Sequence, residues 1–295
     1  MDHNIFDHLP DAIPPVLLVR PDRHIAPIIF VSSHSGRDYP PRFVAEAQLD
    51  PVSLRHSEDS FVDDLCGAAV THGAPLLLAT FPRAYCDANR EKWELDQAMF
   101  ADALPTWVNT SSARVGAGLG TVARVVASGQ PIYREKLQFS DVARRINACW
   151  QPFHDQLTAL VTETRLHFGG CLVIDCHSMP TPIVIDRHIG RDSTFILGDS
   201  FGQSCDTRLT KIICSTIKKA NYKVLRNVPY AGGYITKTYG QPKNNIHTIQ
   251  VEIPRQIYMN EYSVVPSKDY IMTKRIIEMV IIKLTEFAAE FNIKK

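Results

Sequence analysis

The chain has 295 residues, of which 45% are hydrophobic, and 32 basic against 31 acidic side chains give it a formal net charge of +1. This length and composition predict a large core, and no linker interrupts residues 1–295, so we expect one domain. A balanced charge offers no electrostatic surface for nucleic acid or an anionic membrane, and we expect neither partner. No apolar run approaches the roughly 20 residues of a spanning helix. The segment Met1–Arg20 lacks the pattern of a signal peptide.

The seven cysteines are scattered along the chain and form no CxxC pair. This usage fits a reducing cytosol better than a disulfide scaffold. It also argues against a cysteine-rich zinc site. We therefore expect a cytoplasmic protein with free thiols.

Short apolar runs that recur along the chain predict β-strands. These runs are Pro27–Ser33, Leu76–Phe81, Leu172–Cys176, Phe195–Gly198, Tyr222–Leu225 and His247–Ile253. The segments between them have helical periodicity. Alternating strands and helices predict an α/β fold with a mostly parallel sheet and right-handed crossovers.

The helical segments differ in how clearly the sequence marks their ends. The predicted helices are Leu54–Ala69, a long one capped by Ser140 or Asp141 and ended by Gly169-Gly170, one from Leu209 to Ile217, and a last one beginning at Ser267. Pro152 is a candidate kink in the long helix. The segment 101–137 is rich in glycine and small residues, and we expect it to form a lid or flap over a site.

Two predicted strands end in a histidine. Cys171–Ile174 is apolar throughout and leads to Asp175 and His177, while the strand at residues 27–33 leads to His34. Open α/β sheets place their ligand crevices at the carboxyl ends of strands. Taken alone, His177 is more typical of a hydrogen-bonded histidine near the core. Two histidines that converge there are the beginning of a zinc site, which needs an Asp, Glu or His as third ligand.

The segment 56–64 offers carboxylates for that third position. On a helix, Asp59 and Asp63 would share one face, because residues four apart are neighbours. The alternative is an acidic first turn that complements the helix dipole. Both interpretations remain open on these residues alone.

Arginines follow the next strand. Arg83 and Arg90 lie near its end and could bind a carboxylate or stabilise an oxyanion, and Asn89 could add a directional donor. The alternative is a surface loop with a structural ion pair to Asp87 or Glu91.

An acid interrupts the apolar strand at residues 249–253. Gln250 and Glu252 share one face of it. A buried glutamate without a partner is costly, and beside an activated water Glu252 would be a general base. The turn Gly232-Gly233 could bring Tyr234 to the same ligand crevice at the ends of the strands.

In this order, the segments resemble the N-formylglutamate amidohydrolase family over roughly residues 27 to 262. The matching pieces are Ser33-His34-Ser35-Gly36 with Tyr39-Pro40, Ser57-Glu58-Asp59-Ser60-Phe61-Val62-Asp63, Pro82-Arg83-Ala84-Tyr85-Cys86-Asp87-Ala88-Asn89-Arg90, Asp175-Cys176-His177-Ser178-Met179, Gly232-Gly233-Tyr234 and Gln250-Val251-Glu252-Ile253-Pro254-Arg255. That family resembles the zinc carboxypeptidases and aspartoacylase in fold. The resemblance implies a three-layer, mostly parallel mixed sheet flanked by helices.

The resemblance also implies roles for individual residues. Zn²⁺, or another divalent transition metal, would be held by His34, His177 and one carboxylate. Zinc carboxypeptidases take that carboxylate from the position three after the first histidine, which here is Arg37 and cannot ligate. Asp59 is the replacement we expect, with Asp63 and Glu58 as alternatives.

The remaining roles complete a hydrolytic site. Glu252 is expected to be the base, and Arg83 to polarise the scissile carbonyl. Asn89 and Arg90, with Tyr234 nearby, are expected to bind a substrate carboxylate.

The implied activity is metal-dependent hydrolysis of an N-formyl amino acid, with N-formyl-L-glutamate giving formate and L-glutamate in histidine catabolism. One alternative is a zinc peptidase or another N-acyl amino acid hydrolase. The other is a non-catalytic protein that binds an acidic metabolite. The sequence does not indicate the oligomeric state.

Overall fold

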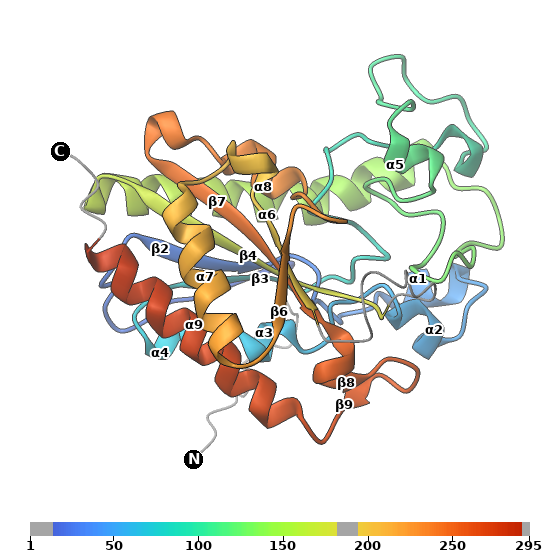
Figure 1. The fold of residues 1–295 in the computed structure, drawn as a ribbon. Helices are drawn as coiled ribbons and strands as arrows, with labels where there is room; N and C mark the ends of the chain where they lie inside the picture. The colour runs from blue at the N-terminus through green and yellow to red at the C-terminus, as the bar shows by residue number, and fades with distance from the viewer. Residues whose placement is uncertain (1–13, 182–193, 291–295) are drawn as a thin grey trace.

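The computed structural model describes residues 14–181 and 194–290. Part of the predicted domain 1–295 therefore lies outside the described residues. The same holds for the start of Met1–Arg20, the segment in which we expected no signal peptide. The main sheet has seven strands in the order β1-β3-β2-β4-β7-β5-β6 (Figure 1). Its strands are β1 (Val16–Val19), β2 (Ile28–Ser32), β3 (Leu76–Ala79), β4 (Cys171–Met179), β5 (Thr194–Gly198), β6 (Lys223–Arg226) and β7 (Ile246–Pro254). A small second sheet pairs β8 (Met259–Asn260) with β9 (Val265–Pro266).

Helices cover the sheet and fill the connections. The α-helices are α1 (Pro41–Glu46), α2 (Pro51–Arg55), α3 (Val62–Leu65), α4 (Ala68–Thr71), α5 (Ala113–Gly116), α6 (Phe139–Phe168), α7 (Thr207–Lys219), α8 (Tyr234–Tyr239) and α9 (Tyr270–Glu290). Short 3₁₀ turns are η1 (Gln97–Met99), η2 (Ser200–Gly202), η3 (Pro242–Asn244) and η4 (Arg255–Ile257).

The centre of the sheet is parallel. Strands β3, β2, β4 and β7 run the same way, whereas β1 is antiparallel to β3. Strand β5 is antiparallel to β7 and parallel to β6. The predicted mixed, mostly parallel sheet is therefore confirmed.

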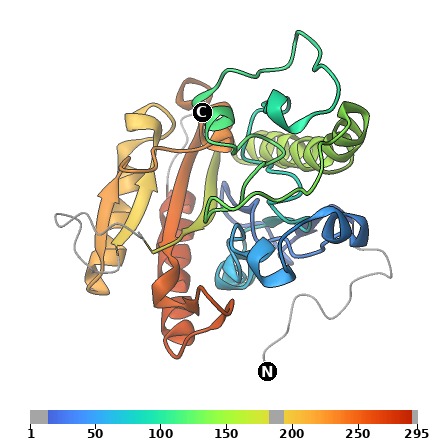
Figure 2. The same cartoon turned by 90° about the vertical axis from the view of Figure 1, so that its right-hand side faces the viewer.

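Side chains of the central strands alternate between two cores. On β4, Leu172 and Ile174 pack in the core that also contains α7 and α9 residues. Cys171 and Val173 pack in the opposite core, which contains α6 and α8 residues. Figure 2 shows this arrangement from the side, with α6 viewed nearly along its axis. Because strand residues alternate between the two faces, the chain builds the three layers that we expected.

The predicted helix Leu54–Ala69 is wrong. The structure has three short helices there, α2, α3 and α4. Phe61 adopts a left-handed backbone conformation with φ of 68°, which a continuing helix cannot contain. The backbone N–H of Asp59 donates to the carbonyl of His34 at 3.0 Å, so a contact distant in sequence holds this turn outside the helix.

The long helix differs from its prediction at the N-terminus. Its N-cap is Gln138, not Ser140 or Asp141, and α6 continues across Pro152. Gly169 ends it in a left-handed conformation with φ of 83°, as predicted.

Other elements also have different bounds from those expected. Helix α9 begins at Tyr270 rather than Ser267. Strand β4 runs on to Met179, so His177 lies within the strand instead of after it. The short edge strand β1, which pairs with β3, was not predicted.

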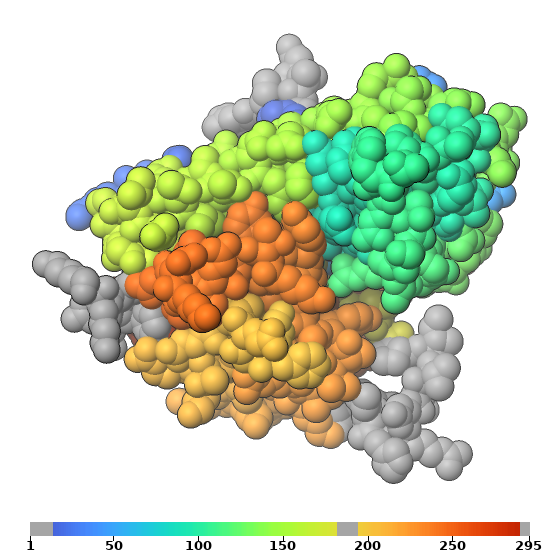
Figure 3. Space-filling model, turned by 90° about the horizontal axis from the view of Figure 1, so that it is seen from above, coloured from blue at the N-terminus to red at the C-terminus, as the bar shows by residue number. Residues whose placement is uncertain are grey.

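The segment 101–137 contains little regular structure besides α5. Figure 3 shows it, coloured teal to green, packed beside α6. Its predicted function as a lid stays a prediction.

Two further findings concern the cysteines and the helices of the described residues. All seven cysteines lie among the described residues and are free thiols. No helix in residues 14–181 or 194–290 combines the length and apolar character needed to cross a membrane.

Because only one face of α6 packs against the sheet, we expect substitutions on its buried and exposed faces to differ in their effect on the free energy of unfolding. Leu157 is fully buried in this interface, whereas Leu166 on the same helix is 82% exposed. Leu157→Ala should lower the free energy of unfolding by about 2–5 kcal/mol, because it leaves a cavity. Leu166→Ala, the control, should change it by less than about 0.5 kcal/mol. Urea denaturation measures both, and equal losses would contradict this packing.

Candidate functional site

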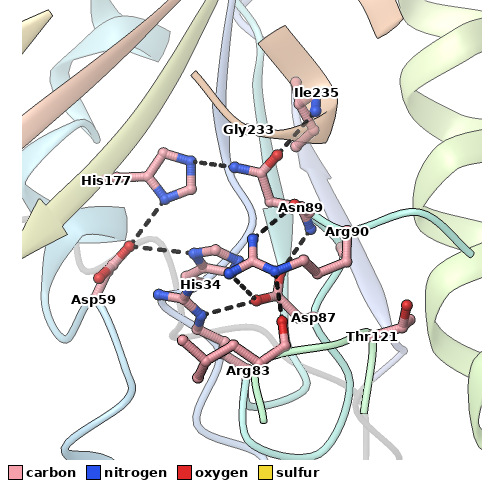
Figure 4. Close-up of polar contacts among 12 residues, drawn as sticks. His34, Asp59, Arg83, Asp87, Asn89, Arg90, Thr121, His177, Gly233 and Ile235 are labelled. Atoms are coloured by element: carbon pink, nitrogen blue, oxygen red, sulfur yellow. Dashed lines mark hydrogen bonds and ion pairs between the residues drawn. The ribbon is translucent and has the colours of Figure 1, made fainter. Parts of the chain in front are cut away.

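Three buried side chains from separate segments converge at the carboxyl end of the sheet. His34 follows β2, Asp59 lies in the turn between α2 and α3, and His177 lies on β4 (Figure 4). Asp59 Oδ2 is 3.0 Å from His177 Nδ1 and 3.4 Å from His34 Nδ1. One nitrogen of each imidazole and one carboxylate oxygen lie within 4.8 Å of one another. We call His34, Asp59 and His177 the His–Asp–His group.

The far nitrogens of both imidazoles face carboxylates. His34 Nε2 donates to Asp87 Oδ1 at 2.7 Å, and His177 Nε2 lies 2.9 Å from Asp175 Oδ1. These contacts orient both rings so that both Nδ1 atoms point toward Asp59. A carboxylate behind a histidine is the usual arrangement around a metal-binding imidazole, because it holds the ring and raises its basicity.

A second set of contacts orients Asp59 itself. Its Oδ1 accepts hydrogen bonds from Arg255 Nη2 at 3.0 Å and from the Ser178 hydroxyl at 3.1 Å. Oδ2 is thereby left to face His34 and His177. The carboxylate can therefore offer one oxygen to a ligand while the other is held by the protein.

Burial and mutual charge shift the pKa values within this group. Burial alone would raise the pKa of Asp59, but His177 and His34 hold it well below its usual range. Burial would lower the pKa of His177, but Asp175 and Asp59 raise it well above its usual range. The group is thus built from opposite charges that stabilise one another.

The His–Asp–His group fits a divalent transition metal. Two imidazole nitrogens and one carboxylate oxygen are a common ligand set of catalytic zinc sites. His34 Nδ1 is buried and makes no hydrogen bond, and its polar neighbour is Asp59 Oδ2 at 3.4 Å, the oxygen that also faces His177. The geometry distinguishes Asp59 from its alternatives: Asp63 pairs with Arg37 at 3.0 Å, and Glu58 accepts hydrogen bonds from Tyr39 and Ser60.

Glu252 lies directly beside the group. It sits on β7 opposite His177 on β4, and its Oε1 accepts a hydrogen bond from Gln250 Nε2 at 2.6 Å. Burial raises the pKa of Glu252 to about 7; His177 opposes this rise, while the Asp59 charge adds to it. A carboxyl with a pKa near neutrality can both take and return a proton.

The arginines predicted for the site converge on Asp87. Arg83 Nε donates to Asp87 Oδ2 at 2.9 Å, and Arg90 Nη2 lies 3.5 Å from the same oxygen. The ion pairs that we considered as an alternative to a functional role are therefore present. The Arg83 side chain is still 26% exposed, and it carries its charge at the edge of the His–Asp–His group (Figure 4).

The side-chain amide of Asn89 makes its contacts within the protein. Its Nδ2 lies 3.1 Å from His177 Nε2, and its Oδ1 accepts the backbone N–H of Ile235 at 2.8 Å. A Cβ on Gly233 would lie only 2.4 Å from the Asn89 side chain, so a glycine is needed where this turn passes. Tyr234 begins α8 beside this contact, and its ring packs against Trp150 and His154.

Three residues that orient His34 and Asp59 were not predicted for this role: Asp87, Arg255 and Ser178. Asp87 was considered as an ion-pair partner for arginine, and not as the partner of His34. Arg255 and Ser178 were given no role in holding a metal ligand. Arg255 directly follows the end of β7, where a charged residue after a buried strand is a signal that could have been used.

The sheet carries two buried imidazoles, a carboxylate between them and a glutamate of raised pKa. This arrangement is typical of metal-dependent hydrolases. The sequence model for N-formylglutamate amidohydrolase matches residues 26–259. The chain belongs to the N-formylglutamate amidohydrolase family, and the predicted resemblance is confirmed.

Individual relatives agree with this membership. The crystal structure of N-formylglutamate amidohydrolase from Ralstonia eutropha is 31% identical, with a TM-score of 0.88 over 95% of this chain and 100% of that one. The N-formylglutamate deformylase of Pseudomonas aeruginosa is 27% identical over 242 residues, covering 80% of this chain and 83% of that protein. The enzyme of the same name from Pseudomonas putida is 29% identical over 194 residues, or 64% and 66% of the two chains.

The carboxylate behind His177 provides a test of the metal site. Asp175→Asn removes the charge that orients His177, and should weaken metal binding by about 10- to 100-fold. Competition with a chromophoric chelator measures this affinity. Asp155→Asn, an exposed change on α6, is the control and should leave the affinity unchanged. If both variants bind zinc as tightly as the unmodified protein, Asp175 does not support a metal ligand.

Proposed function

We propose that this protein hydrolyses the amide bond of N-formyl-L-glutamate, giving formate and L-glutamate. The observation that carries the proposal is the position of Glu252 directly across from His177, beside the His–Asp–His group. Membership of the N-formylglutamate amidohydrolase family and the names of the relatives from Ralstonia and Pseudomonas support the substrate.

The metal in this proposal is Zn²⁺, held by His34, Asp59 and His177. Such a metal would supply Lewis-acid chemistry to the hydrolysis. Asp87, Asp175, Arg255 and Ser178 would keep the three ligands in place through the contacts described above. Another divalent transition metal with the same ligand preference is the alternative.

Glu252 is the proposed general base and acid. It takes a proton from the water that attacks the formyl carbon, and it delivers a proton to the nitrogen of the leaving amine. The C–N bond breaks, the oxygen of water remains in formate, and glutamate leaves as the free amine. A pKa of about 7 allows Glu252 to perform both transfers near neutral pH.

Arg83 is proposed to stabilise the carbonyl oxygen as it gains negative charge. Its Nε is held by Asp87, while its terminal nitrogens make no hydrogen bond to any residue in the described part of the chain. The pKa of Arg83 is raised: burial opposes the rise, and the charges of Asp87, Asp59 and Glu252 together outweigh it. A fixed, charged donor pair of this kind is suited to an oxyanion.

Arg90 is proposed to bind a carboxylate of the substrate. Its Nε donates to the carbonyl of Leu119 and its Nη1 to that of Asn89, which fixes the plane of the guanidinium. Asn89 joins this arrangement as a positioning residue, because its amide already contacts His177 and Ile235. Tyr234 is proposed to line the substrate site beside Asn89, whose backbone carbonyl accepts the N–H of Tyr234 at 3.4 Å.

Several expectations accompany this proposal. They are a single catalytic domain over residues 1–295, a lid formed by residues 101–137, action in the cytoplasm and a place in histidine catabolism. The segment 101–137 contacts the site through the Leu119 carbonyl and through the Thr121 carbonyl, which accepts the N–H of Asp87 at 2.7 Å. These contacts support the lid proposal.

Formate release tests the proposal directly. The purified protein should release formate from N-formyl-L-glutamate, lose this activity after treatment with a strong chelator, and regain it when Zn²⁺ is restored. N-acetyl-L-glutamate and a dipeptide ending in glutamate serve as comparison substrates. Full turnover by metal-free protein would refute metal dependence, and preference for the larger acyl groups would favour another N-acyl amino acid hydrolase or a peptidase.

The role of Glu252 has its own test. Glu252→Gln keeps the size of the side chain and removes its proton exchange, so kcat should fall by about 10²- to 10⁴-fold while bound zinc is retained. Glu135→Gln, an exposed change in the segment 101–137, should behave as the unmodified protein. Retention of turnover by the zinc-loaded Glu252→Gln variant would show that another group is the base.

A further inference from the structure

Two guanidinium groups meet at one backbone carbonyl beside the proposed site. The oxygen of Asn89 accepts from Arg90 Nη1 at 2.9 Å and from Arg114 Nη1 at 3.4 Å. Arg90 belongs to the loop after β3, whereas Arg114 comes from α5 in the segment 101–137 (Figure 1). The chain thus brings a second positive charge from a distant segment to the residue proposed to bind a substrate carboxylate.

The charges around this point do not balance within the described part of the chain. Arg83, Arg90 and Arg114 are three cations, and Asp87 is the one carboxylate within ion-pair distance of any of them. Asp87 also accepts a hydrogen bond from His34. The next acid, Glu94, is buried, accepts a hydrogen bond from the Ser112 hydroxyl and also acts on Arg90 through its charge. Three arginines against these two carboxylates leave an excess of about one positive charge beside the His–Asp–His group.

This excess positive charge destabilises the protonated guanidinium of Arg90 when no anion is bound. Arg90 is buried, and burial together with the neighbouring charges of Arg83 and Arg114 lowers the pKa of Arg90 to about 10, although Asp87 opposes this change. Guanidinium groups that converge in a partly buried place are stabilised by a carboxylate, which they can bind through charge-assisted hydrogen bonds.

We propose that Arg114 is a specificity-determining residue, which binds the side-chain carboxylate of the substrate while Arg90 binds its α-carboxylate. The inference rests on the proposed function and narrows its substrate class to N-acyl derivatives of acidic amino acids. Such a substrate carries two carboxylates, one for each of the two guanidinium groups that meet at the Asn89 carbonyl. A neutral side chain of the same size leaves the Arg114 charge without a counterion, and is therefore rejected.

Paired substrates test this assignment. N-formyl-L-glutamine has the length of N-formyl-L-glutamate but lacks the side-chain charge. Arg114→Met should lower kcat/KM for N-formyl-L-glutamate by about 10- to 100-fold, mainly through KM, because one charge-assisted contact is lost. The same variant should change kcat/KM for N-formyl-L-glutamine by less than about threefold, and Arg114→Lys should recover part of the lost preference.

Arg134→Met is the matched control. Arg134 is exposed in the same segment, so this variant removes one positive charge without touching the site, and its substrate preference should be unchanged. Thermal melting establishes that each variant is folded. Equal loss on both substrates by folded Arg114→Met would assign Arg114 a structural role and overturn the proposal, as would an unchanged preference.

A binding measurement separates this inference from the proposed activity. Calorimetry with glutarate, a dianion, and with its monoamide needs no turnover. Glutarate should bind the zinc-loaded protein more tightly than the monoamide, and Arg114→Met should remove most of that difference. If the protein hydrolyses no formyl substrate but keeps this pattern, the proposed reaction fails while the carboxylate site stands. If both ligands bind Arg114→Met as they bind the unmodified protein, the carboxylate site is refuted.

Discussion

The carboxylate of Asp59 is fully shielded from solvent, and its charge must be balanced by the groups around it. Moving an ion out of water costs several kcal/mol even after the protein relaxes. A single hydrogen bond to a charged group returns only about 1.5–3 kcal/mol, so one partner is too few. Asp59 has four polar partners: two imidazoles at one oxygen, and Arg255 with Ser178 at the other.

The order of strands makes this balance feasible. His34 follows β2, His177 lies on β4 and Arg255 follows β7, and these three strands are neighbours in the sheet. The register of β4 on β7 also places His177 opposite Glu252 and Asp175 opposite Gln250. A slip of one residue would turn each side chain to the other face of the sheet. The proposed metal ligands and the proposed base are thus positioned by the same backbone hydrogen bonds that build the core.

The parts of the site that the sequence predicted are those that follow from strand patterns. His34, His177 and Glu252 interrupt or end apolar runs, and parallel strands bring such positions to one edge. The structure places Asp59 beside both histidines, as expected, but in a turn and not on the predicted helix, which is broken at Phe61. The hydrogen bond from Asp59 to the His34 carbonyl spans segments that helical periodicity cannot connect. The same is true of Asp87, Arg255 and Arg114, whose partners are distant in sequence.

The central claim is that His34, Asp59 and His177 bind one metal ion. X-ray absorption at the zinc edge on the zinc-loaded protein tests it most directly, because it distinguishes nitrogen and oxygen ligands from sulfur, and Cys176, the cysteine next to His177 in sequence, faces the opposite core. Nitrogen and oxygen neighbours at about 2.0–2.2 Å are expected, with an imidazole scattering pattern and no sulfur at about 2.3 Å. The expected stoichiometry is one zinc per chain, lost in His34→Ala and in His177→Ala. A sulfur neighbour, or zinc that remains bound in both variants, would contradict the claim.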